Sequence, residues 1–387
     1  MLLLRACLCQ GDEGLSAWRE WSSSVDIERL DWESNRLLPL LYTKLAAQNI
    51  RHPWMGRMKG CYRYTWVRNS RLLAGASDLV KRLRDVAGND QILLKGAAMA
   101  CAHLPNIGLR SMEDVDMLVR TEVAWPVCRR LQADGWTPRR LRSERTFLHF
   151  QRSTKSSAFF RKQEKLDLHW GLLDDLIGSA LHEAFWQASQ EAQLPDGTRV
   201  KVLHVADQLF QTCLHGVRAD QGPSPRWITD AATLIGKMRD EDWNRLQSVA
   251  EERRFTLRMG KALEFLREKF GENVPIPPAI IRQLLHHPHS SLEEKEYERR
   301  VNPELGRKRG ALTSYREFVL HSRPPRIWGY PADYMRFLMK RWDLSNSILV
   351  PVTLAKRAMR KVWGKVKGAS EKSEVSRLRR GYGEPGK

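Results

Sequence analysis

The chain has 387 residues, 42% of them hydrophobic, so it is long enough for two or three domains with a real core. Its 65 Lys and Arg residues outnumber its 45 Asp and Glu residues, giving a formal charge of +20. This charge favours polyanionic partners such as nucleic acid, nucleotides or phospholipid surfaces, but an effect on solubility alone accounts for it equally well. No apolar run approaches the ~20 residues of a membrane-spanning helix, so no membrane span is expected.

The cysteines lie in apolar helical patterns, without a CxxC pair or a histidine cluster that would complete a zinc site. They are Cys7, Cys9, Cys61, Cys101, Cys128 and Cys213. This distribution predicts reduced core residues in a cytoplasmic protein. The opening "MLLLRACLCQ" has no basic segment before its apolar run, which Arg5 interrupts. We therefore expect a helix packed on the core rather than a signal peptide or a lipid-modified Cys7.

Residues 1–86 are predicted to form an N-terminal helical region, because leucines recur at helical spacing in "RLLPLLYTKL" and "SRLLAGASDLVKRLRDV". A small α/β domain is predicted over 87–204. It begins with a strand in "QILLKG", a helix in "AAMACAHL", a strand in "EDVDMLV" and a helix in "EVAWPVCRRLQADG" that Gly135 closes.

Three further segments of this domain are rich in aromatic and β-branched residues and are separated by polar breaks. They are "RTFLHFQR", "SAFFRK" and "EKLDLHW", which we interpret as consecutive strands of a mixed sheet. The turn Asp196-Gly197, followed by "TRVKVLH", predicts one more strand. The fold class is therefore α+β, with a small mixed sheet between N-terminal and C-terminal helical regions.

The C-terminal helical region is predicted over 205–345, from the helical periodicity of "VADQLFQTCLHGV", "PRWITDAATLIGKM" and "TLRMGKALEFLREKFG". Residues 346–387 are predicted to form a flexible basic tail. From 352 onward it carries eleven Lys or Arg residues against three Glu. The tail is either a solvated extension or a contact for nucleic acid or a membrane surface.

Two aspartates, Asp114 and Asp116, occupy the apolar strand "EDVDMLV". Residues i and i+2 of a strand face the same side, roughly 6.6 Å apart, while Val115 and Met117 face the core. Two unpaired carboxylates so placed repel each other and are costly to bury, and a divalent cation such as Mg²⁺ removes this cost. A third carboxylate on a neighbouring strand would allow two ions about 3.5–4 Å apart. Asp167 in "KLDLHW" is the candidate; the alternative is a pair of exposed aspartates at a strand end.

A strand that ends in glycine and leads into a helix exposes backbone N–H groups, which suits a triphosphate. The segment Leu94-Lys95-Gly96 has this pattern, and Lys95 adds a positive charge. The spacing therefore predicts a phosphate site upstream of the two aspartates.

These segments together resemble a bacterial nucleotidyltransferase family of the DNA polymerase β-type superfamily. The resemblance is carried by "LLKG", by "GLR" at 108–110, by Asp114-Val115-Asp116 and by "LDLHW" at 166–170, followed by "CLHG" at 213–216 and "RWITDAATLI" at 226–235. It covers most of residues 15–345, and these spaced elements agree in order. Ala97 departs from the wider superfamily, in which Gly or Ser follows the glycine, and the stretch from Gly96 to Asp114 is longer than usual there.

The resemblance implies that Asp114 and Asp116 bind two metal ions, Mg²⁺ or Mn²⁺. It implies that Asp167 completes the metal site and helps to deprotonate the acceptor. Gly96 would lie against the nucleotide phosphates, and Lys95 and Arg110 are either triphosphate contacts or structural residues.

The supporting candidates lie on the later elements. His169 would either orient Asp167 or be a satisfied, partly buried histidine. His215, Arg226 and Asp230 would contact nucleotide or acceptor, or form structural pairs in the helical region.

The expected function is transfer of a nucleoside monophosphate from an NTP such as ATP, with release of pyrophosphate. A small molecule, a sugar or a peptide is the expected acceptor, and the basic surface and tail leave nucleic acid open as a partner. The rival interpretation is a noncatalytic nucleic-acid-binding or scaffold protein that retains the fold.

Overall fold

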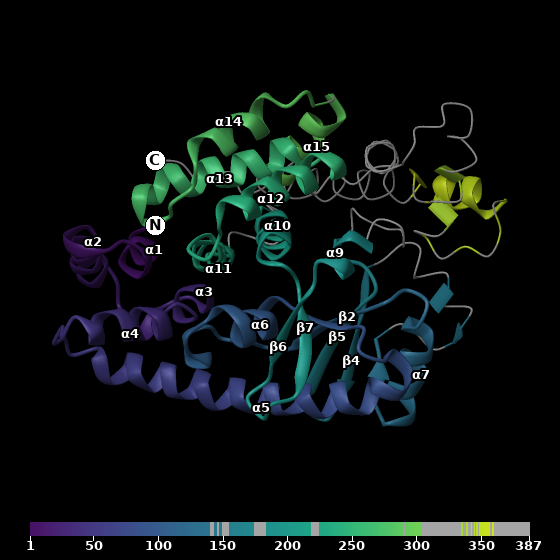
Figure 1. Ribbon diagram of the computed structural model, residues 1–387, viewed down its shortest axis with the longest axis horizontal. Helices are drawn as coiled ribbons and strands as arrows, with labels where there is room; N and C mark the ends of the chain where they lie inside the picture. The colour runs from purple at the N-terminus through teal and green to yellow at the C-terminus, as the bar shows by residue number, and fades with distance from the viewer. Residues whose placement is uncertain are drawn as a thin grey trace, which may run out of the picture. The chain divides into compact units, whose positions relative to one another are not determined.

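The structure is a computed structural model (Figure 1). It describes residues 1–139, 155–173, 183–217, 224–289 and 291–302, with short runs between 143 and 148 and between 334 and 359. Residues 1–324 form one compact unit, and residues 325–387 form a second, of which only a few residues are described, including a helical run at 349–356. The remainder of the predicted basic tail, from 360, lies outside the described residues. The boundaries predicted at 86, 204 and 345 stay predictions.

The N-terminal region is helical, as predicted. Its helices are α1 (Leu2–Leu8), α2 (Gly11–Ser24), α3 (Trp32–Asn35), α4 (Leu38–Ala47) and α5 (Met55–Ala87), with a 3₁₀ turn at Ile27–Arg29. Residues Leu3, Leu4 and Cys7 of α1 are buried in the core, which confirms a packed helix at this position. Helix α5 is 33 residues long, and its buried positions recur every three or four residues, so one stripe of the helix packs on the sheet.

Seven strands form one mixed sheet in the order β3-β4-β5-β2-β1-β7-β6. Their bounds are β1 (Gln91–Leu94), β2 (Val115–Val119), β3 (Thr137–Pro138), β4 (Ser156–Arg161), β5 (Glu164–His169), β6 (Gln190–Gln193) and β7 (Arg199–Val202). Strand β2 is antiparallel to β1 and parallel to β5, while β1 is parallel to β7. The predicted α+β class with a mixed sheet is thus confirmed.

Short helices connect the first strands. Helix α6 (Lys95–Ala98) continues into a π-helical turn at Met99–His103, and a 3₁₀ turn at Ile107–Leu109 follows. Helix α7 (Ala124–Ala133) ends before Gly135, whose φ of +84° is the left-handed conformation that glycine adopts freely. Helix α9 (Glu183–Gln187) precedes β6.

The alternation of side chains along the central strands separates two hydrophobic cores. Leu93, Met117 and Leu168 face α5 and α7, in a core that these helices close. Ile92, Leu94 and Leu118 face the opposite side, where they join the core of the N-terminal and C-terminal helices. Asp116 lies between Val115 and Met117, so its side chain is on this second face.

The C-terminal helices cover the second face. They are α10 (Val205–Gly216), α11 (Arg226–Ile235), α12 (Asp240–Arg253), α13 (Thr256–Phe270), α14 (Pro278–His286) and α15 (Ser291–Val301), with a 3₁₀ turn at Gly271–Asn273. Figure 1 shows the sheet between α5 on one side and this helical group on the other. No helix in the described part of the chain combines the length and the apolar character of a membrane-spanning segment.

One predicted strand is wrong where it can be examined. The segment "RTFLHFQR" is predicted to be a strand, but Phe147 and Leu148 are helical. The other residues of this segment lie outside the described ranges. Phe147 packs its ring against Trp125 of α7 and against Trp170. The Phe147 side chain is thus buried in a helical segment. A short run rich in aromatic residues does not distinguish such a segment from a strand.

Candidate active site

The two predicted carboxylate segments meet on the central strands. Strands β2 and β5 are parallel, and Asp116 pairs in register with Asp167. Asp114 directly precedes β2, and its carboxylate accepts a hydrogen bond from the Lys165 ammonium, two residues before Asp167. All three aspartates therefore lie on the sheet face opposite α5. The register brings together the carboxylates that the sequence predicts to act jointly.

His169 lies between two of these carboxylates. Its Nε2 is 3.0 Å from Asp116 Oδ1 and 3.0 Å from Asp167 Oδ2. Its Nδ1 is 3.3 Å from the carbonyl oxygen of Gly171, so acceptors face both ring nitrogens. A ring that donates from both nitrogens is protonated. His169 is fully buried, and its contacts suit both predicted alternatives, a histidine that orients Asp167 and a satisfied histidine, so the choice between them stays a prediction.

Lys95 supplies a second cation to the same group. Its ammonium donates to Asp116 Oδ1, and its side chain is 27% exposed. The backbone of Lys95 has φ +47°, a left-handed conformation that is uncommon for residues other than glycine. Such conformations persist where the surroundings hold them and are concentrated at functional sites. Here it turns the chain from β1 into α6 and directs the lysine to the carboxylates.

Charge is retained throughout this group despite burial. Burial alone would raise the pKa of Asp116, but Lys95 and His169 outweigh it and lower that pKa to about 2. The pKa of Asp167 is likewise lowered, because His169 outweighs the effect of burial. Burial opposes the charge of His169 and of Lys95, yet the carboxylates raise the pKa of both. At neutral pH the two aspartates are thus ionised, and they favour the charged forms of the neighbouring imidazole and ammonium.

Gly96 lies against the segment that leads to Asp114. A Cβ atom at this position would be 2.4 Å from Arg110 Nη1 and 2.8 Å from Met112 Cγ. Only a residue without a side chain permits this approach. The glycine predicted to lie at the phosphates therefore also allows the Arg110 guanidinium to reach the start of α6.

Arg110 is held by Asp230 of α11. Its Nε donates to Asp230 Oδ1 at 2.8 Å and its Nη2 donates to Oδ2 at 2.8 Å, in a bidentate pair whose side chains are each 11% exposed. Burial opposes the charge of Arg110, but Asp230 outweighs it and raises the pKa of the guanidinium. The pair leaves Nη1 directed at Gly96. The pair with Asp230 is a buried structural contact, and the triphosphate contact predicted as the alternative for Arg110 stays a prediction.

A family model described as an uncharacterised nucleotidyltransferase matches residues 25–271. The chain belongs to this nucleotidyltransferase family. No curated protein matches the chain. The matched range contains the three aspartates, His169 and the Arg110–Asp230 pair, and the family supports a transferase enzyme.

The donor atoms of this nucleotidyltransferase fit a divalent cation. Asp116, Asp167 and His169 offer ligand atoms that all lie within 4.8 Å of one another. Metal ligands must be deprotonated, and both carboxylates are ionised at neutral pH. Carboxylate oxygens suit Mg²⁺ and Mn²⁺, and His169 Nε2 lies 3.0 Å from both carboxylates. Asp114, the third predicted ligand, is outside this three-residue group and pairs with Lys165.

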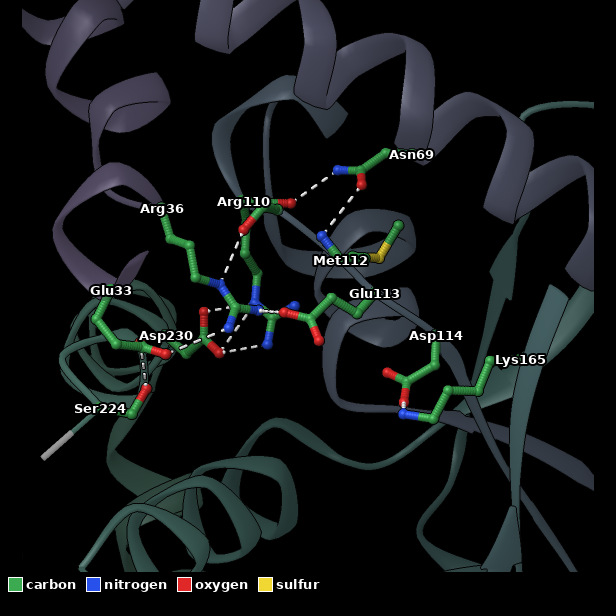
Figure 2. Close-up of polar contacts among 11 residues, drawn as sticks. Glu33, Arg36, Asn69, Arg110, Met112, Glu113, Asp114, Lys165, Ser224 and Asp230 are labelled. Atoms are coloured by element: carbon green, nitrogen blue, oxygen red, sulfur yellow. Dashed lines mark hydrogen bonds and ion pairs between the residues drawn. The ribbon is translucent and has the colours of Figure 1, made fainter. Parts of the chain in front are cut away.

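Sequence reasoning missed two residues that hold the segment before Asp114 (Figure 2). Asn69 of α5 is fully buried; its Nδ2 donates to the carbonyl oxygens of Ile107 and Arg110, at 2.5 and 2.7 Å, and its Oδ1 accepts from the Met112 N–H at 3.2 Å. A polar residue within the apolar stripe of an amphipathic helix was the available signal.

The second missed residue is Arg36, which directly follows α3. Its Nε donates to Ser111 Oγ at 3.2 Å, and its Nη2 is 2.9 Å from Glu113 Oε1. Its side chain is only 7% exposed. Figure 2 shows Arg36 between Glu33 and Glu113, beside the Arg110–Asp230 pair. No local pattern around Arg36 indicates these contacts, because they depend on how the N-terminal helices pack.

The remaining predicted supporting residues lie on two adjoining helices. His215 is half-buried near the end of α10, and Arg226 is the first residue of α11. A Cβ atom on Gly216 would be 2.1 Å from Trp227 Cγ, so this glycine permits the close approach of the two segments. The "HG" and "RW" elements therefore meet, and they place Asp230 one helical turn further along α11.

Proposed function

We propose that this nucleotidyltransferase transfers a nucleoside monophosphate from an NTP to an acceptor, with Asp114, Asp116 and Asp167 as the ligands of Mg²⁺ or Mn²⁺. The observation that carries the proposal is the parallel register of β2 and β5, which pairs Asp116 with Asp167. Asp114 lies two residues before Asp116 on the same chain segment. A divalent cation bound there would neutralise the carboxylates and the developing charge on the phosphates.

The reaction is an in-line displacement. An oxygen of the acceptor, a hydroxyl or a phosphate, forms a bond to the α-phosphorus, the bond from that phosphorus to the β-phosphate oxygen breaks, and pyrophosphate leaves. When the acceptor is a hydroxyl, its proton passes to the Asp167 carboxylate as the new bond forms. His169 Nε2 is 3.0 Å from Asp167 Oδ2 and fixes the orientation of this carboxylate.

Positive side chains around the carboxylates would bind the triphosphate. Lys95 and Lys165 contact Asp116 and Asp114 and would turn toward the phosphates when the aspartates take a cation. Arg110 Nη1 is directed at Gly96, where the β- and γ-phosphates would lie. Charged donors fixed in advance stabilise a transition state without reorganisation. The pair with Asp230 fixes the guanidinium in this way.

The acceptor proposed is a small molecule, a sugar or a peptide. A nucleic-acid acceptor is the second possibility, which the formal charge of +20 supports. The six cysteines are free, which agrees with a reducing cytoplasm as the place of action.

The test is pyrophosphate release with each of the four NTPs and Mg²⁺ or Mn²⁺, in the presence of acceptor pools, with products identified by mass. The variant Asp116→Asn/Asp167→Asn should lose release by at least about 10³-fold, because electrostatic stabilisation of the transferred group is lost. The matched control is Asp78→Asn, an exposed aspartate of α5 paired with Arg82. Undiminished release by the double variant would refute the proposal.

A further inference from the structure

The first half of α5 presents an exposed surface whose composition folding does not explain. The inner stripe of the helix, with Met58, Asn69 and Leu73, is buried. On the outer side, the side chains alternate between cations and aromatic or aliphatic groups. We call this surface the basic-aromatic face; it consists of Lys59, Arg63, Tyr64, Trp66, Val67 and Arg71. Figure 1 shows α5 at the edge of its unit, with the sheet on one side only.

Large apolar groups on this face are open to water. Tyr64 is 66% exposed, Trp66 is 45% exposed and Val67 is 44% exposed. Single exposed apolar residues are common, but here three lie within four positions: Tyr64 and Val67 are neighbours three residues apart on the helix, and Trp66 lies on the other flank of the basic-aromatic face.

The cations of the face have no acidic partners. No Asp or Glu occurs between Met55 and Ser77, and Lys59, Arg63 and Arg71 form no ion pair with any residue that the structure describes. The second half of the same helix differs: Lys81 is 2.8 Å from Asp196 Oδ2, and Arg82 is 2.8 Å from Asp78 Oδ2. Within the first half, Arg57 also has an acidic partner, in Glu28, whereas Lys59, Arg63 and Arg71 have none among the described residues. These three cations would therefore suit an anionic partner outside the chain.

We propose that the basic-aromatic face binds the surface of an anionic phospholipid membrane. Tyr and Trp prefer the headgroup region, where their apolar rings and polar atoms are both accommodated. Lys and Arg beside them would pair with anionic headgroups. The face is one side of a 33-residue helix whose other side packs on α4, on the 3₁₀ turn at Ile107–Leu109 and on β2, so it can lie along a flat surface without unfolding.

Other occupants fit this face less well. A second copy of the chain, related by a two-fold axis, would bring like cations together. The C-terminal tail is itself basic, with eleven Lys or Arg and three Glu from 352 onward. A single-stranded nucleic acid binds in a positively charged groove, whereas this face is the convex side of one helix.

Binding through α5 would leave the active site accessible. The carboxylate group lies on the sheet face opposite α5, as the two separate cores show. A membrane against the basic-aromatic face would therefore be behind the sheet, and the NTP would still enter from solution. The enzyme would work beside the membrane without its site being covered.

The test measures binding of the full chain to vesicles of 70% phosphatidylcholine and 30% phosphatidylglycerol by co-sedimentation. Each cation near such a surface raises the partition coefficient about fivefold, so Lys59→Gln/Arg63→Gln/Arg71→Gln should weaken binding about 100-fold. The matched control is Lys81→Gln/Arg82→Gln/Arg84→Gln, with the same charge change on the same helix but outside the basic-aromatic face; it should bind within about threefold of the unaltered chain, because Lys81 and Arg82 already pair with Asp196 and Asp78.

Further arms separate the alternatives. Tyr64→Ser/Trp66→Ser should also weaken vesicle binding, and all variants should keep their circular dichroism and any pyrophosphate release, since the face is remote from the carboxylates. The same proteins are titrated with single-stranded RNA and duplex DNA. Equal vesicle binding by the two triple variants, no vesicle binding by the unaltered chain, or a loss confined to nucleic-acid binding would each overturn the proposal. The vesicle result does not depend on the transferase reaction.

Discussion

Replacing Gly96 by alanine tests whether this glycine is required for the approach of Arg110. The backbone at Gly96 is helical, so alanine is conformationally acceptable and, without contacts, would stabilise the helix by roughly 0.5–1 kcal/mol. The added Cβ would, however, lie 2.4 Å from Arg110 Nη1 and 2.8 Å from Met112 Cγ. Both groups must therefore move, and the guanidinium is restrained by Asp230.

The magnitude follows from these two effects. Forcing a methyl group into a filled site costs about 1–3 kcal/mol. Weakening the charge-assisted pair between Arg110 and Asp230 adds about 1.5–3 kcal/mol if the pair separates. After the helix gain is subtracted, Gly96→Ala should lower the free energy of unfolding by about 1.5–5.5 kcal/mol when the pair separates. Pyrophosphate release should fall as well, because Arg110 Nη1 would leave its position beside the phosphates.

The assay is urea denaturation followed by circular dichroism, with Gly60→Ala as the matched control. Gly60 is also helical, but a Cβ there meets no atom within 4 Å, so the control should be stabilised by up to about 1 kcal/mol. If Gly96→Ala is as stable as this control, the contact between Gly96 and Arg110 does not restrict the site and the reasoning is wrong.

Three more variants test the surroundings of the site. Asn69→Ala removes three hydrogen bonds to the segment 107–112, and each buried group left unpaired costs about 1–3 kcal/mol. The free energy of unfolding in guanidinium titrations should therefore fall by at least about 2 kcal/mol. A fall of less than about 0.5 kcal/mol would contradict this role of Asn69. Lys165→Met frees Asp114 from its ion pair, so calorimetry should show tighter Mn²⁺ binding than in the unaltered chain, and weaker binding would argue against Asp114 as a ligand. Burial opposes the charge of Asp90, but Arg120 and Lys201 outweigh it and lower its pKa. The stability it contributes is thus present above its unfolded pKa of about 3.9 and is lost as pH falls through the lower folded value. Asp90→Asn should be destabilising at pH 7 in urea titrations, and a difference that persists in strong acid would exclude this ion pair as its cause.

The sequence was sufficient for the elements that carry a strong pattern. Strands β1, β2, β4, β5 and β7 were predicted because apolar and β-branched residues dominate them or alternate along them. Strand β6 has the sequence "QEAQ", lies at the sheet edge and is mostly exposed, so its pairing with β7 leaves no hydrophobic signal. Strand β3 was missed as well, because two residues are too few to show an alternating pattern.

The site was predicted where its residues share a strand and missed where they meet by packing. The spacing of Asp114 and Asp116 is enough to place them on one face, and the expected partnership with Asp167 needs only neighbouring strands. Arg36 and Asn69 reach the segment before Asp114 from helices far away in sequence, so their role depends on tertiary contacts. Arg110 Nη2 contacts Asp230 while its Nη1 faces Gly96, and this arrangement likewise depends on tertiary packing.

The pairing of β2 with β5 has a consequence for how this enzyme can vary. The register between Asp116 and Asp167 is set within the sheet, while the connection between the two strands contains α7, β3 and β4. Insertions in that connection lengthen a loop and leave the two carboxylates opposite each other, since closing a longer loop costs little. A single residue inserted within β2 would instead turn Asp116 into the apolar core beneath α5. Chains of very different length can therefore keep the same centre, provided that two short strands keep their length.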